Sequence, residues 1–301
     1  MNASIKNQKI KILASLSLAL IMLLGKPVYS QDSVATAPAK AAKPVKNTFA
    51  GIWLIDNQSV MVPIKGTFEF DILHRFGVVK NGYEDLFGLF ASSNIRLGFN
   101  YSPIDRLYVG FGLTKYKMLW DVNAKYAIFQ QMSEGWPVSI TYYGNAAIDT
   151  RSEEFFIHFS DRLSYFNQLI IARKFTPKFS AQIAPSLSHT NVVNGYYSAP
   201  GEVSPERKHN HFAVAISGRY KLTETLSLLA NYDQPITKHK SGNPHPNLSF
   251  GLDVTTSSHS FQIFFGNYYF LSPQQNNMYN TNDYKNGEYL IGFNITRLWN
   301  F

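Results

Sequence analysis

The chain has 301 residues, of which 45% are hydrophobic and only 16% are charged, and it contains no cysteine. A chain without cysteine has no disulfide, no thiolate metal site and no lipoprotein anchor, and it is compatible with an oxidising compartment. The formal charge of +8 includes four lysines within the first 30 residues, and the other basic residues are scattered, so no nucleic-acid partner is expected.

The N-terminus has the three parts of a secretory signal peptide. Lys6, Lys9 and Lys11 form a positive region, an apolar run covers residues 12–24, and small residues precede a cleavage site. The apolar run has about 13 residues, fewer than the roughly 20 that a membrane-spanning helix needs. Residues 1–30 are therefore predicted to be a signal peptide for export.

Two further stretches precede the first regular pattern. Residues 31–47 are rich in Ala, Pro and Lys, which is typical of a flexible segment. Residues 48–65 contain the apolar piece FAGIWLI, which is compatible with either a short strand or a plug inside a barrel. We predict a flexible periplasmic N-terminal segment over residues 31–65, and the pattern leaves the role of residues 48–65 open.

The rest of the chain has a hydrophobic pattern with a period of two. Phe68, Phe70 and Ile72, for example, alternate with Glu69 and Asp71. A helical face would need apolar residues three and four positions apart, and that spacing is absent from the sequence here. The pattern defines about twelve segments of roughly 9 to 14 residues, the length of a tilted strand that crosses a bilayer. They lie near residues 67–76, 93–101, 107–117, 120–131, 136–146, 163–175, 178–190, 210–220, 224–235, 247–255, 258–268 and 288–301.

The connections between these segments alternate in length. They are short after even segments (102–106, 132–136, 176–178, 222–224, 256–257) and mostly long after odd ones (77–92, 147–162, 191–209, 236–246, 269–287), with a tight turn near Met118 as the exception. Outer-membrane barrels have short periplasmic turns and longer outside loops. We therefore predict that residues 66–301 form an all-β, transmembrane antiparallel up-and-down β-barrel of about 12 strands, with both termini periplasmic.

The last segment, residues 289–301, has one aromatic face made of alternate side chains. On this face, Phe293, Trp299 and the terminal Phe301 resemble the C-terminal signal that outer-membrane proteins present to the barrel assembly machinery. That machinery and outer-membrane lipid are the expected partners. Arg297 is charged, but it lies close enough to the strand end to reach the interface, where an Arg costs on the order of 0 to 1 kcal/mol.

Several motifs in the barrel region are similar to those of a known family. They are FDILHRFG (70–77), DLFGL (85–89), NIRLGFNYSPIDRLYVGFG (94–112), QLIIARKF (168–175) and GFNITRLW (292–299). On these motifs, residues 70–301 resemble an uncharacterised outer-membrane β-barrel family of Bacteroidota, domain of unknown function 5777. The resemblance implies an outer-membrane barrel without an assigned activity, and it carries over no catalytic or binding residue.

Alternation directs a set of charged side chains toward the barrel interior. These lumen-lining residues are Glu69, Asp71, Arg75, Arg96, Asp121, Lys125, Arg219, Asp233 and Asp253. Their signs are mixed, unlike the single-sign ring of a selective ion channel. Two interpretations stay open: a salt-bridge network that fills the lumen, or a lining that selects a small polar solute. Alternation does not orient the segment at 163–175, so Arg173 and Lys174 remain unassigned.

Histidines concentrate in or beside the long connections. His209 and His211 share one face of a strand, and His239 and His245 lie in the next long connection, so a divalent metal or haem contact is one hypothesis. Histidine is common in polar surface loops, and this spacing is loose. These four residues are therefore weak metal candidates, and no cofactor is expected.

The enzymatic alternative is a lipid hydrolase at the barrel rim. It would need His, Ser and an orienting Asn or Asp within hydrogen-bond reach. His74 is the outward histidine nearest the outside rim, and its predicted neighbouring strands offer no outward Ser and Asn. The sequence also has no G-x-S-x-G, paired-carboxylate or Gly-rich phosphate motif, so no catalytic residue is predicted.

The pattern as a whole favours a channel or binding barrel for a small solute. The first alternative is a closed structural barrel whose outside loops bind a partner or a metal, and the second is the rim hydrolase. The first two differ in whether the lumen is open, which the sequence does not determine.

Overall fold

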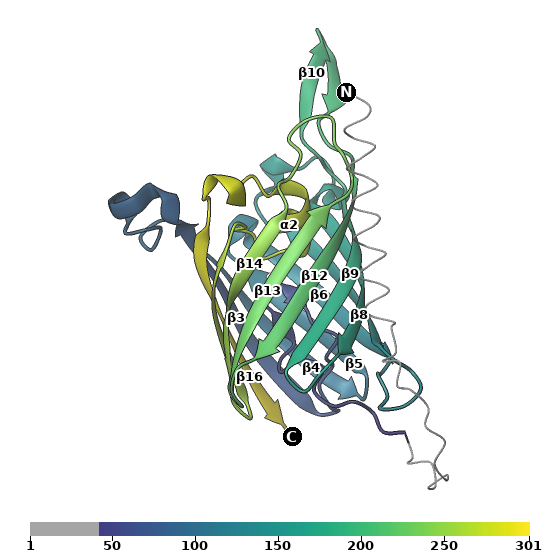
Figure 1. The fold of residues 1–301 in the computed structure, drawn as a ribbon. Coiled ribbons are helices and arrows are strands. Elements are labelled where there is room, and N and C mark those ends of the chain that lie inside the picture. The colour runs from purple at the N-terminus through teal and green to yellow at the C-terminus, as the bar shows by residue number, and fades with distance from the viewer. Residues whose placement is uncertain (1–41) are drawn as a thin grey trace, which may run out of the picture.

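Twelve long strands form a closed antiparallel barrel in the computed structural model, which describes residues 42–301 (Figure 1). Each strand pairs with its neighbours in barrel order, and the last pairs with the first. The predicted signal peptide lies outside the described residues. The barrel strands are β3 (Thr67–Val78), β4 (Asn94–Ile104), β5 (Leu107–Thr114), β6 (Leu119–Phe129), β7 (Ser139–Asp149), β8 (Leu163–Lys174), β9 (Phe179–Thr190), β12 (Asn210–Lys221), β13 (Leu226–Pro235), β14 (Asn247–Thr255), β15 (His259–Gly266) and β16 (Leu290–Asn300).

The predicted fold class is confirmed, and each barrel strand begins and ends within three residues of its predicted segment. Strand β6 shows why the period of two was informative. Leu119, Asp121 and Lys125 are buried on its inner face, whereas Trp120 and Val122 are 50% and 58% exposed on its outer face. Successive side chains of a strand point to opposite faces, so the sequence alone separates the two environments.

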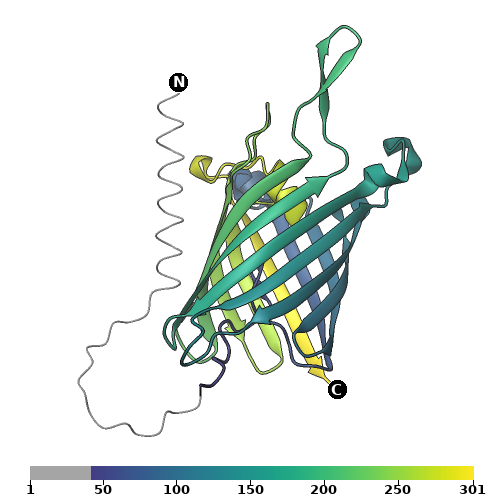
Figure 2. The same cartoon turned by 90° about the vertical axis from the view of Figure 1, so that its right-hand side faces the viewer.

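The barrel has a short-turn end and a long-loop end. The C-terminus and the described start of the chain lie at the short-turn end, and the long connections lie at the other (Figures 1 and 2). A hairpin of β10 (Gly195–Ala199) and β11 (Glu202–Pro205) stands above the long-loop end (Figure 1). The connections at that end also contain the 3-10 helices η1 (Val79–Asp85), η2 (Tyr116–Met118), η3 (Glu153–Phe155), η4 (Phe159–Arg162) and η5 (Tyr284–Asn286).

Strand β16 closes the barrel against β3. Trp299 is paired with Phe68, and their ring centroids are 5.6 Å apart. The Asn300 side-chain amide donates a hydrogen bond to Thr67 Oγ1 at 3.0 Å. Phe301 follows the strand and is 88% exposed. Closure leaves no sheet edge with unpaired backbone groups, which an apolar medium would not tolerate.

The N-terminal segment enters the barrel and occupies part of its lumen. At the short-turn end, the Val45 amide donates to the Gln131 carbonyl at 2.8 Å. Further along, β1 (Trp53–Leu54) and β2 (Asn57–Gln58) form a short antiparallel hairpin, and we call residues 49–62 the lumen hairpin. The apolar piece of the sequence is thus a plug. This part of the segment, expected to be flexible, is packed against the barrel instead.

Helix α2 (Pro273–Tyr279) enters the lumen from the long-loop end (Figures 1 and 2). It belongs to the connection between β15 and β16 and contacts β8, β9 and β12. Its side chains Gln274, Gln275, Asn276 and Met278 are buried, although most of them are polar. The sequence pattern indicated only a long loop here.

Across the described part of the chain, no helix is both long enough and apolar enough to span a membrane.

The lumen hairpin shares an apolar core with the barrel. Its side chains Phe49, Leu54 and Ile55 are at most 1% exposed. Burying a side chain of this size stabilises the folded state by roughly 1.5–3 kcal/mol. The hairpin is therefore firmly held in the closed barrel. The barrel residues in this cluster are Tyr143, Phe166, Ile170, Ala172, Ala184, Ala215, Leu229, Phe264 and Tyr268.

Candidate functional site

The charged network inside the barrel is centred on Arg96 of β4. Its guanidinium donates to Asp71 Oδ1 at 3.0 Å and makes two bonds of 2.9 Å to Asp121. Asn100 donates to the other oxygen of Asp71 at 2.8 Å, and Asn145 donates to Asp121 at 2.9 Å. These groups come from β3, β4, β6 and β7, and Gly112 of the intervening β5 leaves room for the pair of Arg96 and Asp121. Both carboxylates are therefore paired and hydrogen-bonded.

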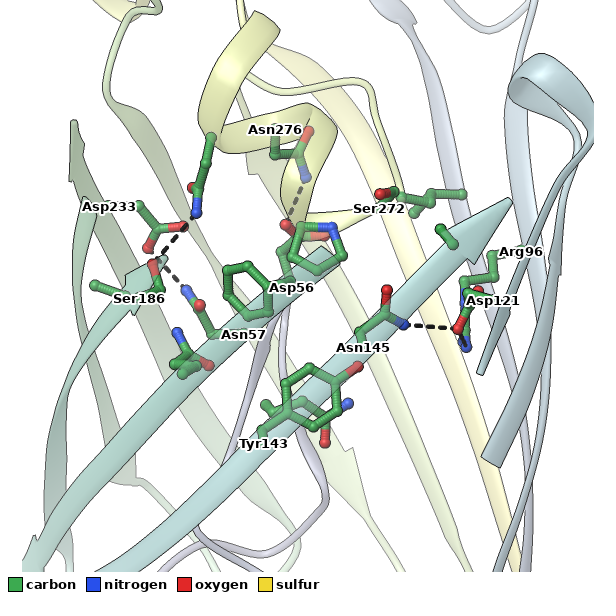
Figure 3. Close-up of a pocket in the computed structure, with 18 of the residues that line it drawn as sticks. Asp56, Asn57, Arg96, Asp121, Tyr143, Asn145, Ser186, Asp233, Ser272 and Asn276 are labelled. Atoms are coloured by element: carbon green, nitrogen blue, oxygen red, sulfur yellow. Dashed lines mark hydrogen bonds and ion pairs between the residues drawn. The ribbon is translucent and has the colours of Figure 1, made fainter. Parts of the chain in front are cut away.

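A second network holds the tip of the lumen hairpin. Asp56 Oδ1 lies 3.2 Å from Arg75 Nη2 of β3, and Asp56 Oδ2 accepts a hydrogen bond of 2.6 Å from Asn276 of α2. Arg75 also donates to Asn294 Oδ1 at 2.9 Å, and its guanidinium lies 4.5 Å from the centre of the Phe264 ring. The Asp56 carboxylate thus connects the wall, the hairpin and α2, and its hydrogen bond to Asn276 of α2 is shown in Figure 3.

Further polar groups of the hairpin are matched by side chains of the wall. Asn57 donates to Asp233 Oδ1 at 2.8 Å, and Gln58 Oε1 accepts from Lys125 Nζ at 2.8 Å. The Ile55 carbonyl accepts a bond of 2.6 Å from Asn294. Because a buried backbone or side-chain polar group needs a partner, these bonds fix the hairpin in one position.

The cavity where the hairpin tip, α2 and the wall meet is very small. The cavity shown in Figure 3 has a volume of about 20 Å³, and its lining includes Asp56, Asn57, Asn145, Asp233 and Asn276. About 10–15 Å³ is needed to hold one water molecule, so this cavity has room for little more than that. In this conformation that cavity has no space for a solute.

A much larger hollow lies at the short-turn end, and we call it the vestibule. Its volume is about 570 Å³, within the range of about 300–1,000 Å³ that is usual for small-molecule sites. Lys174, Arg219 and Lys221 line it together with Glu224, and the Lys221 and Glu224 side chains are 2.6 Å apart. Positive groups thus outnumber negative ones. The other lining residues are Asn47, Ala50, Pro177, Thr225, Thr255, Thr256 and Ser257.

The structure gives every predicted lumen residue a specific environment. Besides the groups described above, Glu69 accepts a hydrogen bond of 2.7 Å from Tyr108, and Asp253 accepts one of 2.7 Å from Ser260. Arg219 is only half-buried because it lies at the vestibule rather than in the middle of the barrel. Lys174, which the sequence left unassigned, also lines the vestibule.

The four candidate metal-binding histidines are only partly brought together. The ring nitrogens His211 Nδ1 and His239 Nε2 are 2.8 Å apart, but His209 Nδ1 bonds to the Thr190 carbonyl and His245 lies 3.8 Å from Asp283. Within residues 42–301, no group of three or more His, Cys, Asp or Glu side chains is arranged to hold a metal ion.

His74, the rim histidine, is packed among aromatic rings on the outer face. Its ring stacks on Phe293 with centroids 4.7 Å apart and an interplanar angle of 7°, and it meets the edge of Phe76 at 4.4 Å. These contacts support aromatic packing at this position.

Sequence reasoning missed the amide side chains that complete the lumen. Asn57, Gln58 and Asn276 come from segments without a clear period, and Asn294 carries no charge that would distinguish it among the alternate residues of the last segment. The signal available was the amide-rich run of residues 274–277, which is unusual for an exposed loop because it carries no charge.

Comparison with known proteins gives distant similarities among solved structures. No curated protein matches the chain. The chain is similar to the NanC porin, with 10% identity, a TM-score of 0.48, and 78% of this chain and 99% of that one covered. An outer-membrane channel from Pseudomonas putida F1 is 10% identical, with a TM-score of 0.46, and the match covers 79% of this chain and 97% of that one. The Pseudomonas putida toluene transporter TodX is 9% identical, with a TM-score of 0.38, and the match covers 82% of this chain and 93% of that one.

The family match covers most of the chain. Residues 49–299 match a family described as a membrane bound beta barrel domain (DUF5777). The matched range begins at Phe49 and therefore includes the lumen hairpin as well as the barrel strands. The chain accordingly belongs to this family of domains of unknown function, and the protein is a membrane-bound β-barrel.

Proposed function

We propose that this protein is an outer-membrane barrel that binds a small polar solute and lets it pass only when the lumen hairpin moves. Both termini would then lie on the periplasmic side, and the vestibule would face the periplasm. The exported character of the N-terminus, the short turns and the longer opposite loops support this placement.

The polarity of the filled lumen supports a gated barrel most strongly. A barrel that stayed closed would gain from an apolar lining, because replacing buried ion pairs with packed apolar residues is often neutral or stabilising. This lumen instead keeps buried charges on its strands. These charged side chains become favourable when water or a solute enters the lumen and solvates them. The buried charged residues are Glu69, Asp71, Arg75, Arg96, Asp121, Lys125, Asp233 and Asp253.

The contacts of the hairpin suit a movable plug that is closed at rest. Its hydrogen bonds to the wall can be exchanged for bonds to water at a net cost of about 0.5–1.5 kcal/mol each. Its apolar anchors Phe49, Leu54 and Ile55 add a larger cost of release. An outside contribution, such as a bound solute, is therefore needed to open the barrel.

A reversible crosslink tests the proposal. Because the chain contains no cysteine, only the introduced thiols can react. Asn57 and Asp233 are in contact, so a short thiol-reactive reagent with a reducible spacer can join the hairpin to β13 in the double variant Asn57→Cys/Asp233→Cys. We expect solute flux into liposomes from the wild-type barrel, none from the crosslinked double variant, and recovery after the spacer is reduced. Each single cysteine variant is the control.

A deletion of residues 49–62 provides the complementary measurement. If the remaining barrel inserts and folds, it should leak small solutes without gating. A wild-type barrel that is tight to all solutes, or a crosslinked one that conducts as well as the wild type, would contradict the proposal.

The second candidate is a closed structural barrel that acts through its long loops. It is favoured by the apolar core that the hairpin shares with the wall and by the small central cavity. The same liposome assay separates the two, because this candidate requires a tight bilayer under every condition in which the hairpin is intact.

A further inference from the structure

Two loops at the long-loop end project sideways from the barrel, away from its axis. In Figure 1 the loop after β3, which contains η1, extends to the left as a blue segment. In Figure 2 the teal loop with η3 and η4 extends to the right. The β10–β11 hairpin differs, since it stands above the end of the barrel. Sideways loops at the strand ends of a membrane barrel lie over the surrounding membrane.

The first loop, residues 79–91, carries large apolar side chains that the protein itself does not cover. Tyr83 is 85% exposed, Phe90 is 80% exposed and Phe87 is 52% exposed. An exposed group of this kind is unfavourable in water and is commonly a site of interaction. Aromatic side chains in particular are enriched where a membrane meets water.

The loop is built to hold these side chains in place. The Gly77 amide donates to the Gly88 carbonyl at 2.9 Å, and a Cβ on Gly88 would lie only 2.3 Å from the Gly77 oxygen. Asp85 accepts hydrogen bonds from the Gly88 amide at 2.7 Å and from the Asn81 side chain at 2.8 Å. These hydrogen bonds hold the backbone of the loop in one conformation and satisfy several of its polar groups.

The loop also continues a surface that already faces lipid. It follows directly from β3, whose outer face carries Phe70, Ile72 and Phe76. Of its three charged residues, Lys80 pairs with Glu288 of the neighbouring loop at 3.5 Å, Asp85 is hydrogen-bonded within the loop, and Glu84 is exposed. Exposed aromatic and charged side chains on one loop suit a segment that rests in the headgroup region.

We propose that Tyr83, Phe87 and Phe90 insert into the lipid leaflet at the long-loop end and anchor the barrel at a fixed depth. The occupant of this surface is the boundary between the lipid headgroups and the acyl chains. The anchor is independent of solute passage, because the loop lies outside the lumen.

The second loop has the same character at another position on the rim. Phe155 is 55% exposed, Ile157 is 88% exposed and Phe159 is 69% exposed. Asp161 accepts hydrogen bonds from the Ile157 amide at 3.2 Å and the His158 amide at 2.8 Å, which fixes this loop as well. Two such anchors between different pairs of strands would limit tilting of the barrel in the membrane.

Single cysteine variants with a nitroxide label measure the depth directly. The sites are Phe90→Cys in the first loop, Val122→Cys on the outer face of β6 as the lipid control, and Tyr197→Cys in the β10–β11 hairpin as the water control. Val122 and Tyr197 are 58% and 79% exposed. In phosphatidylcholine vesicles, we compare collisions of each label with oxygen, which concentrates in lipid, and with a water-soluble nickel chelate.

We expect the oxygen-to-nickel ratio at residue 90 to resemble that at residue 122 and to exceed that at residue 197 several-fold. A ratio at residue 90 equal to that at residue 197 would overturn the proposal, because the loop would then lie in water. Shielding from both reagents would also overturn it and would indicate a protein contact, such as a second copy. A heat-dependent shift in electrophoretic mobility verifies that each variant is folded.

Discussion

Arg75 and Asp56 form an ion pair that joins the barrel wall to the lumen hairpin, with 3.2 Å between Nη2 and Oδ1. The Arg75 side chain is fully buried and that of Asp56 is 10% exposed. Asn276 of α2 binds the other carboxylate oxygen. The two segments that fill the lumen from opposite ends therefore meet at one acidic group, and its charge is balanced by the wall.

We expect Asp56→Asn to loosen the hairpin while the barrel stays intact. The substitution keeps the size of the side chain but leaves the Arg75 charge buried without a counter-ion, and breaking a buried pair in this way costs about 3–5 kcal/mol. Protease sensitivity of the hairpin and solute flux into liposomes should both increase. The control is Glu224→Gln, which removes the 92% exposed partner of Lys221 and should leave the stability of the barrel almost unchanged, because exposed ion pairs contribute little. If Asp56→Asn and the wild type resist protease equally, the ion pair of Asp56 and Arg75 does not hold the hairpin in place.

The Arg96 network should behave as one unit in unfolding experiments. Arg96→Met leaves Asp71 and Asp121 as buried carboxylates without their cation, so we expect a loss of about 3–5 kcal/mol in the free energy of unfolding. Adding Asp71→Asn should restore part of this loss, with a coupling of about 0.5–3 kcal/mol. Urea unfolding in micelles, followed by tryptophan fluorescence, gives the double-mutant cycle. Strictly additive effects would show that the groups act separately.

Gly88 should be essential for the first sideways loop but not for the barrel. Its φ is +84°, and an added Cβ would meet the Gly77 oxygen, so Gly88→Ala must displace the loop from β3. Gly82→Ala is the matched control, since its φ of +66° is also positive but no atom lies within 4 Å of the added Cβ. We expect that control to cost about 1–3 kcal/mol through backbone strain alone. Limited proteolysis within residues 79–91 should be faster for Gly88→Ala than for Gly82→Ala. Faster cleavage of Gly82→Ala than of Gly88→Ala would contradict this prediction. The heat-dependent electrophoretic mobility of both variants should match that of the wild-type barrel.

The connection at residues 236–246 should open as the pH falls. His239 Nδ1 accepts a hydrogen bond of 3.0 Å from the Lys208 amide, so its Nε2 carries the proton that His211 Nδ1 accepts. Burial, together with the nearby charges of Arg207, Lys208 and Lys238, lowers the pKa of His239 from its ordinary value of 6.5.

The sign of the pH effect follows from proton uptake. The open connection binds more protons than the closed one below about pH 6.5, so the closed form loses stability as the pH falls through that value. We expect faster hydrogen exchange at the Lys208 amide at pH 5.5 than at pH 7.5, after correction for the intrinsic rate. His239→Gln should remove most of this pH dependence. An unchanged pH dependence in that variant would contradict the assignment.

The strands could be predicted because their information is local. In β3, Phe68 and Glu69 are adjacent in sequence and point to opposite sides of the sheet, so the lipid-facing and inward-facing sets are separated without any knowledge of the partner strands. Loop lengths then gave the order of the strands, since short turns join neighbours. The prediction of residues such as Asp71 and Arg96 on the inner face used the same rule.

The content of the lumen was decided by contacts between distant parts of the chain. The Ile55 carbonyl bonds to Asn294, which is 239 residues away, and Asn276 bonds to Asp56 across 220 residues. Neither the apolar piece at residue 49 nor the amide-rich run at residue 274 has a regular pattern that indicates such a partner. The sequence by itself therefore determined a twelve-stranded barrel with an apolar exterior, because alternation is a property of each strand. Only the tertiary structure decided that the lumen is plugged, because the polar groups of the hairpin and of α2 find their partners on strands that are distant in sequence.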